Sequence, residues 1–229
     1  MDMTQQSLFK KRMPLFLVVI LSLLFSVSLI AARVYFTEKV TFIFLVWNLF
    51  LAVIPFIISS VLILYQHKLA RVVLFSAIML WLLFFPNAPY ILTDLFHLKE
   101  RSGVPLWFDL MVILSAAWNG LILGLLSLQD IQHVISKRFS AAWSWVAVML
   151  SLVLCGFGIY VGRYLRWNSW DVVTNPVGLT TDLLERIANP FTHPRTVGVT
   201  ILYTCFLLLA YLFFSQLAKL NFKEENGNG

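Results

Sequence analysis

The sequence predicts an all-α integral membrane protein, a bundle of about six transmembrane helices with one short amphipathic helix at the membrane interface. Of its 229 residues, 60% are hydrophobic and only 12% are charged, and the mean hydropathy is +0.84. A soluble domain of this length could not bury so much apolar surface, and a disordered chain would need low hydrophobicity and high charge. The lipid bilayer is therefore the expected partner of most of the chain.

Six stretches without Asp, Glu, Lys or Arg are expected to cross the bilayer. Each has at least 19 residues, which at about 1.5 Å per residue spans a hydrocarbon layer of roughly 30 Å. The alternating pattern of a membrane barrel strand is absent, so helices are expected. The first stretch is too long for the apolar core of a signal peptide and is interpreted as an uncleaved span. The stretches are residues 14–32, 40–65, 72–92, 110–128, 139–162 and 196–218.

We expect a single transmembrane domain over residues 14–218, with an N-terminal tail at 1–13 and a polar, disordered tail at 219–229. An even number of spans places both termini on one side. Lysines divide six to two in favour of that side, which predicts cytoplasmic termini in the cell membrane. The net charge of +6 is spread over segment ends. Anionic lipid headgroups explain this distribution, and no nucleic-acid partner is expected.

The longest connection, residues 163–195, carries a helix signal of its own. Asn175 is a suitable cap, Pro176 suits the first helical position, and Asn189 begins a stop signal. We therefore predict an amphipathic helix over about 176–188 that lies on the membrane surface. A seventh span is not expected, because three charges would stand at mid-membrane. The side chains expected to face protein or acyl chains are Leu183, Leu184 and Ile187, and those expected to face water are Asp182, Glu185 and Arg186.

Three polar motifs lie on the side opposite the termini. The first is Pro86 to Tyr90, which is expected to end or kink the third helix and is followed by Asp94 and His97. Its two prolines remove two amide donors, which is tolerated at that depth only against protein or a water-filled cavity. The second motif is residues 107–109, and the third is residues 162–171. These motifs are the candidates for a functional site.

Three asparagines within the spans add to this picture. Asn48, Asn87 and Asn119 are all expected in the outer half of the bilayer, roughly 7 to 15 Å deep. A buried amide in lipid needs a partner. Their similar depth suggests a shared cavity.

The polar motifs resemble a known family, the bacterial membrane proteins catalogued as domain of unknown function 1361. The resemblance runs from about Trp47 to Asn175. It rests on FPNAPYILTDLFHL at residues 85–98, WFDL at 107–110 and GFGIYVGRYLRWNSWD at 156–171. It implies a multi-span membrane protein and supplies no activity.

Two site hypotheses stand against a structural interpretation. Trp, Tyr and Arg at helix ends are the usual interfacial anchors, and the aspartates can serve as their partners. The first hypothesis is a divalent metal held by Asp94 and His97, which share a helical face, together with Asp109 or Asp171. The second is a phosphate or carboxylate of a lipid or lipid-linked ligand, clamped by arginines and packed by tryptophans. The candidate ligand-binding residues are Asn87, Tyr90, Asp94, His97, Asp109, Asn119, Arg163, Arg166, Trp167, Asn168, Trp170 and Asp171.

The charged members of this set are expected to form one cluster around an outward-open cavity floored by Asn87 and Asn119. A charge at a span end is costly unless it is paired. Three carboxylates against two guanidiniums leave one negative charge, which His97 or a bound cation would balance. The aromatic content instead favours an amphiphile. The expected cluster consists of Asp94, Asp109, Arg163, Arg166 and Asp171.

Three classes of function remain open. An enzyme would need an acid, a base or a metal in this cluster, whereas a binding or accessory subunit needs only the cluster itself. A transporter or channel would need polar groups through the inner half as well, where the sequence offers little. Signatures of serine nucleophiles, P-loops and dinucleotide sites are absent. No catalytic residue, oligomeric state or cofactor other than the hypothetical metal is predicted, and neither Cys155 nor Cys205 indicates a disulfide or zinc site.

Overall fold

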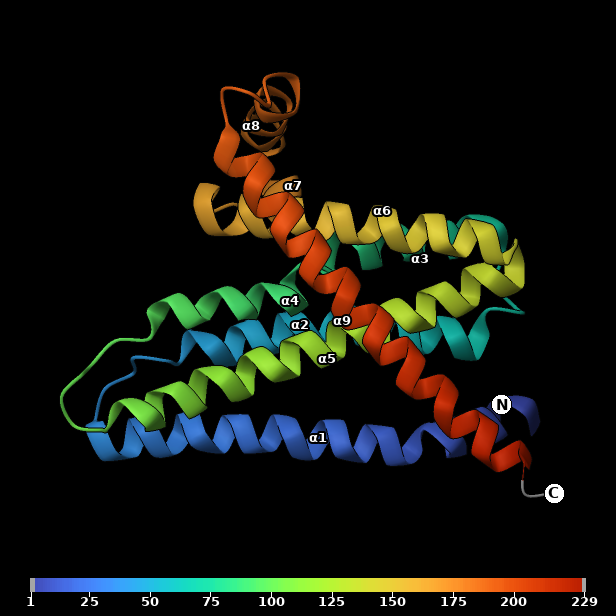
Figure 1. The fold of residues 1–229 in the computed structure, drawn as a ribbon, viewed down its shortest axis with the longest axis horizontal. Helices are drawn as coiled ribbons and strands as arrows, with labels where there is room; N and C mark the ends of the chain where they lie inside the picture. Colours follow the sequence, from blue (N-terminus) through green and yellow to red (C-terminus); the bar gives the residue numbers. More distant parts are fainter. Residues whose placement is uncertain (1–2, 228–229) are drawn as a thin grey trace. The chain divides into compact units, whose positions relative to one another are not determined.

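A computed structural model describes residues 3–227, with side chains for residues 6–217. Six of its helical segments are long and apolar enough to cross a membrane (Figure 1), which confirms the predicted fold class. The second begins at residue 44 instead of 40. The predicted tail at 219–229 lies outside the described side chains. The spanning elements are α1 (Met3–Thr37), α2 (Phe44–Tyr65), α3 (Arg71–Phe84) with its extensions, α5 (Leu106–Arg138), α6 (Ala141–Tyr160) with its extension, and α9 (Pro194–Gly227).

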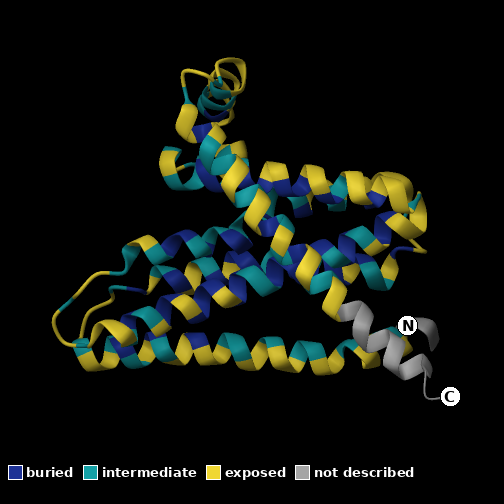
Figure 2. Ribbon diagram, in the orientation of Figure 1, coloured by how far each residue is buried: buried dark blue, intermediate teal, exposed yellow. Residues whose placement is uncertain are grey.

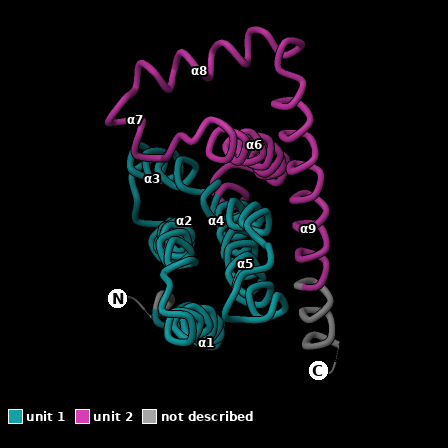
Figure 3. Tube along the Cα trace, turned by 90° about the vertical axis from the view of Figure 1, so that its left-hand side faces the viewer, with its two compact units in different colours: residues 1–134 teal, residues 135–229 magenta. Residues whose placement is uncertain are grey.

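The chain divides into two compact units, residues 1–134 and 135–229 (Figure 3). Unit 1 contains α1 to α4, a 3-10 helix η1 (Ile91–His97) and most of α5. Unit 2 contains α6, a π-helical turn η2 (Val161–Leu165), the short helix α7 (Asp171–Thr174), α8 (Pro176–Ala188) and α9. Each unit is described by itself.

The third span of unit 1 is broken where the prolines predict it. The helix α3 ends at Phe84, a single turn α4 (Asn87–Tyr90) follows, and η1 continues the chain. This break lets α5 approach closely, because a Cβ on Gly120 would collide with the backbone carbonyl of Ala88. Only glycine fits at that position of α5.

The outer surface of α1 is apolar. Leu17, Val18, Leu21 and Leu24 are each more than half exposed, and exposed positions recur along the coloured part of α1 in Figure 2. Exposed aliphatic side chains in such number mark a surface that is solvated by acyl chains.

In unit 2, the helices α6 and α9 pack in close contact. A Cβ on Gly156 would lie 2.6 Å from the carbonyl oxygen of Thr200, so the two backbones meet where α6 has no side chain. The hydroxyl of Thr204 donates to the carbonyl of Leu152 across the same interface, at 3.3 Å. Such close approach through a small residue is typical of helix pairs in membranes.

The predicted helix at 176–188 is confirmed as α8. The Asn175 side chain accepts a hydrogen bond from the Gly178 amide at 3.1 Å, and Pro176 occupies the first turn. In Figure 1 α8 is seen end-on, whereas α6 and α9 run across the picture. Leu184 and Ile187 are 60% and 64% exposed. Its position on the membrane surface stays a prediction.

Candidate functional site

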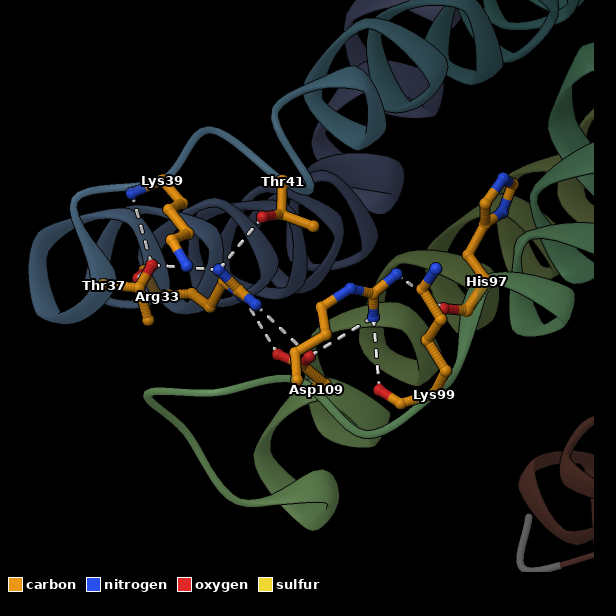
Figure 4. A network of polar contacts seen from close by, with 8 residues as sticks. Arg33, Thr37, Lys39, Thr41, His97, Lys99 and Asp109 are labelled. Carbon is orange, nitrogen blue, oxygen red and sulfur yellow. Dashed lines mark hydrogen bonds and ion pairs between the residues drawn. The ribbon is translucent and has the colours of Figure 1, made fainter.

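A buried ion pair joins α1 to the start of α5. The Arg33 Nε lies 3.0 Å from Asp109 Oδ1, and the Nη2 lies 3.4 Å from Oδ2. The remaining nitrogen of Arg33, Nη1, donates to the hydroxyls of Thr37 and Thr41 at 2.9 and 3.2 Å. Both charged side chains are only 1% exposed. Every nitrogen of this guanidinium thus has a partner (Figure 4), as a buried charge requires.

Arg101 adds a second guanidinium to the same carboxylate. Its Nη1 lies 3.4 Å from Asp109 Oδ2, and its Nη2 donates to the backbone carbonyl of His97 at 2.9 Å. The guanidinium carbons of Arg33 and Arg101 lie 5.1 and 4.8 Å from the centre of the Phe42 ring. The aromatic ring therefore helps to hold two positive charges close together.

Asp94 is buried beside His97, as their spacing predicts. Its side chain is 2% exposed and accepts a hydrogen bond from the Asn48 amide at 2.8 Å. The Nδ1 of His97 lies 3.6 Å from Asp94 Oδ1, and the imidazole is 40% exposed. This imidazole points away from Asp109 in Figure 4 and packs on Phe44, with ring centres 5.2 Å apart. A buried carboxylate thus stands behind a partly exposed imidazole.

The metal hypothesis finds no support in the described part of the chain. No three His, Cys, Asp or Glu side chains gather there in a way that would hold a metal ion. Asp109, a candidate ligand, is instead held by two arginines. No cofactor is indicated.

The other two asparagines of the spans, Asn119 and Asn87, also have protein partners. Asn119 donates to the Ser26 hydroxyl and to the Ser22 carbonyl, at 2.9 and 3.1 Å, and is thereby turned toward α1. Asn87 donates to the carbonyl of Phe84, one turn earlier, at 3.0 Å. Tyr90, a further candidate, contributes its backbone carbonyl to the Thr93 hydroxyl at 2.8 Å. The side chain of Asn119, on α5, therefore bonds α1. The predicted contact of Asn119 with a ligand stays untested.

The third polar motif ends α6 in an unusual conformation. After η2, Arg166 adopts φ 62° and ψ 28°, and its amide donates to the carbonyl of Val161. This left-handed conformation closes many helices but usually belongs to glycine, since a side chain costs about 1–2 kcal/mol there. The Arg166 side chain is exposed and has no hydrogen-bond or ion-pair partner among the described residues.

Aromatic and cationic side chains surround this turn. Tyr164 and Trp170 are 41% and 40% exposed. The guanidinium carbon of Arg195 lies 5.6 Å from the centre of the Tyr164 ring, and Tyr160 stacks on the same ring at 5.4 Å. Arg163 lies within η2 and is partly exposed. The turn thus combines guanidiniums with partly exposed rings.

The other members of the motif have structural partners. The Trp167 indole donates to Asp182 of α8 at 2.7 Å, so this ring tethers α8. Asp171 accepts the backbone amide of Asn168 at 2.6 Å and the hydroxyl of Thr174 at 2.9 Å. The hydrogen bond from the backbone amide of Asn168, together with that from the Thr174 hydroxyl, lowers the pKa of Asp171.

The predicted cluster falls on both units. Asp94 and Asp109 belong to unit 1, whereas Arg163, Arg166 and Asp171 belong to unit 2, so their union remains a prediction. Asp109 is paired in unit 1, but its partners, Arg33 and Arg101, lie outside the three polar motifs and were not in the predicted set. In the sequence, only position marks these two arginines: Arg33 directly follows the first predicted span, and Arg101 lies in the connection between the third and fourth predicted spans.

A second ion pair joins α1 and α5 near the first residues of α1 and the last turns of α5. Arg12 Nη1 and Nη2 donate to the two Asp130 oxygens at 3.0 and 2.7 Å. The Ser59 hydroxyl of α2 donates to the same carboxylate at 3.0 Å. No local sequence pattern pairs these residues, which lie 118 positions apart.

Six apolar helices, two of which are joined by ion pairs toward both ends, define a multi-pass integral membrane protein. The chain belongs to the family described as protein of unknown function (DUF1361), which matches residues 47–210. This confirms the resemblance seen in the motifs and extends it beyond Asn175 to α8 and part of α9. No curated protein matches the chain, and no solved structure does.

Proposed function

We propose that this protein binds an anionic amphiphile, a lipid or lipid-linked molecule with a phosphate or carboxylate group, through Arg166. The observation that carries the proposal is the backbone conformation of Arg166 together with the exposure of its guanidinium. Its backbone adopts a conformation that glycine would adopt at lower cost, and its guanidinium is exposed with no internal partner in the described chain. An unfavourable backbone conformation at a residue that exposes its positive charge supports a binding role for that charge.

The surroundings of Arg166 suit such a ligand. A guanidinium offers two parallel donors to phosphate or carboxylate oxygens. The rings of Tyr164 and Trp170, each about 40% exposed, can pack against the apolar part of the ligand. Arg195, held beside Tyr164, supplies a second positive charge.

The charges that the predicted set places on unit 2 also favour an anion over a cation. They are two guanidiniums, Arg163 and Arg166, against one carboxylate, Asp171. Asp109, with its partners Arg33 and Arg101, belongs to unit 1 and does not enter this balance. A bound anion beside Arg166 would therefore need no protonated carboxylate.

Lipid retention tests the proposal. The protein would be purified in a mild detergent, and its co-purified anionic and zwitterionic phospholipids would be measured by native mass spectrometry. Arg166→Gln should lose most of the retained anionic lipid. Arg71→Gln, which removes an exposed arginine at the start of α3, is the matched control and should retain it. Equal retention in the two variants would refute the proposal.

An acid–base enzyme is the second candidate. The observation that favours it is the buried Asp94 behind the partly exposed imidazole of His97. A carboxylate in that position orients an imidazole and stabilises its charged form, as general acid–base catalysis requires. Incubation with anionic lipids, followed by mass spectrometry of the extract, should then show a product that His97→Gln and Asp94→Asn both abolish. Product formation that survives in both variants would exclude this pair.

A transporter is less well supported. From Gly120 to Leu126, α5 carries only glycine and aliphatic residues, and Met13 to Leu21 of α1 carries no hydrophilic side chain. The ion pairs that join α1 to α5 therefore lie toward the ends of the two helices, with Asn119 between them.

A further inference from the structure

The two ion pairs between α1 and α5 are spaced equally on both helices. Arg12 and Arg33 are 21 residues apart on α1, and Asp109 and Asp130 are 21 residues apart on α5. The 20 residues between the arginines include no Asp, Glu, Lys or Arg, and the same holds for the 20 residues between the aspartates. Because the helices run antiparallel and both pairs are formed, each ion pair joins corresponding ends of the two uncharged segments.

We infer that these pairs mark the two boundaries of the hydrocarbon layer on unit 1. A rise of about 1.5 Å per residue places the pairs roughly 31 Å apart. That distance equals the thickness of a typical hydrocarbon layer, about 30 Å. A charge is costly at the bilayer centre and tolerated at its edges. The apolar surface of α1 and α5 therefore fits a bilayer of ordinary thickness, with one Arg–Asp pair at each face.

The hydrogen bonds of Asn119, which lies between the two ion pairs along α5, fit the same placement. Asn119 lies ten residues from Asp109 and eleven from Asp130, which puts it at the bilayer centre. An amide there finds no water and needs protein acceptors. Asn119 has three, the Ser26 hydroxyl on α1 and the carbonyls of Ser22 and Ser115. Contacts at the two faces and at the centre thus hold α1 to α5.

The placement has a consequence for Asp94. Thr41 bonds the boundary residue Arg33, and α2 begins three residues later, at Phe44. Asn48 is four residues into this helix, so at about 1.5 Å per residue its amide lies roughly 6 Å deeper than the start of α2 and inside the boundary. Its partner Asp94 is then a carboxylate within the acyl layer, screened from lipid by the protein around it. This inference does not depend on the proposed ligand.

Spin labels report depth directly, because oxygen concentrates in the bilayer centre and a water-soluble nickel chelate is excluded from it. Single cysteines would be placed in a cysteine-free variant, reconstituted in phosphatidylcholine vesicles. The positions face outward on α1 and α5. They are Leu17, Leu21, Leu24, Ser28 and Tyr35 on α1, and Trp107, Leu114 and Trp118 on α5.

The ratio of oxygen to nickel accessibility should peak at Leu21 and Leu24, which flank the midpoint between Arg12 and Arg33. Trp118, near the midpoint of α5, should match that peak, while Tyr35 and Trp107 should give interfacial values. A peak at Leu17 or at Ser28, or a Trp118 value that matches the interface, would overturn the placement. Circular dichroism of each labelled variant checks that a deviation does not come from misfolding.

Discussion

Arg33 and Asp109 form an ion pair in which both side chains are 99% removed from solvent. Arg33 belongs to α1, which lies before the family match, and Asp109 lies within it. The pair therefore attaches the first span to the helices that the family shares. The attachment is electrostatic as well as apolar, because every guanidinium nitrogen of Arg33 bonds a carboxylate or hydroxyl oxygen.

Removing one partner should be worse than removing both. In Asp109→Asn the guanidiniums of Arg33 and Arg101 lose their shared carboxylate, and an uncompensated buried charge costs about 3–5 kcal/mol. The double variant Arg33→Leu with Asp109→Leu removes the pair and should unfold closer to the wild type. Unfolding in detergent micelles, followed by circular dichroism against denaturant, measures both. A single variant that is as stable as the double would contradict this account.

The close contact of α6 and α9 predicts that Gly156→Ala destabilises unit 2. The new Cβ would lie 2.6 Å from the Thr200 carbonyl, and separating the helices should cost about 1–3 kcal/mol. Gly198→Ala is the matched control on α9, because no atom lies within 4 Å of its added Cβ. Since alanine favours helices over glycine, the control should stabilise slightly. Melting temperatures of the two variants should therefore move in opposite directions.

The turn at Asn168 to Thr174 should weaken in acid. The folded structure lowers the pKa of Asp171 below its unfolded value. The stabilisation is therefore present above the unfolded pKa and is lost as the pH falls through the lower, folded pKa. Hydrogen exchange at the Asn168 amide, corrected for intrinsic rates, should accelerate over that range. In Asp171→Asn the corrected rate should not change with pH, and a wild-type rate that is equally constant would exclude the carboxylate.

Cysteine labelling tests the orientation in the cell membrane. The lysine distribution predicts that the termini are cytoplasmic, so Ser136 faces the cytoplasm, and Ser102 and Thr180 face outward. All three residues are exposed. A membrane-impermeant maleimide added to intact cells should label cysteines at 102 and 180 and should reach position 136 only after permeabilisation. The opposite pattern would invert the topology.

The six spans and α8 were predictable because each depends on a local pattern. An uncharged run of sufficient length, a cap such as Asn175 or a break such as Pro86 acts within a few residues. The partners of the charges were not predictable in this way, because Arg12 meets Asp130 across 118 residues and any boundary charge was an equal candidate. The equal spacing of 21 residues is visible in the sequence, but it becomes informative only once α1 is known to pair with α5 at both ends.

The conformation of Arg166 predicts that stability and binding respond in opposite directions to one substitution. In Arg166→Gly the left-handed backbone at φ 62° no longer carries a side chain, which should stabilise the folded protein by about 1 kcal/mol. Because the guanidinium makes no hydrogen bond or ion pair among the described residues, little is lost in exchange. If the guanidinium holds an anionic headgroup, the same variant should release its retained anionic lipid.

Arg166→Lys separates the chemistry from the charge. Lysine keeps the positive charge, and its side chain is as unfavourable in the left-handed conformation as that of arginine. It lacks the planar pair of donors. It should leave the melting temperature unchanged and retain less anionic lipid than the wild type. Both variants would be compared by thermal unfolding and native mass spectrometry on the same preparation. A glycine variant that is more stable and still retains the lipid would show that Arg166 does not bind it.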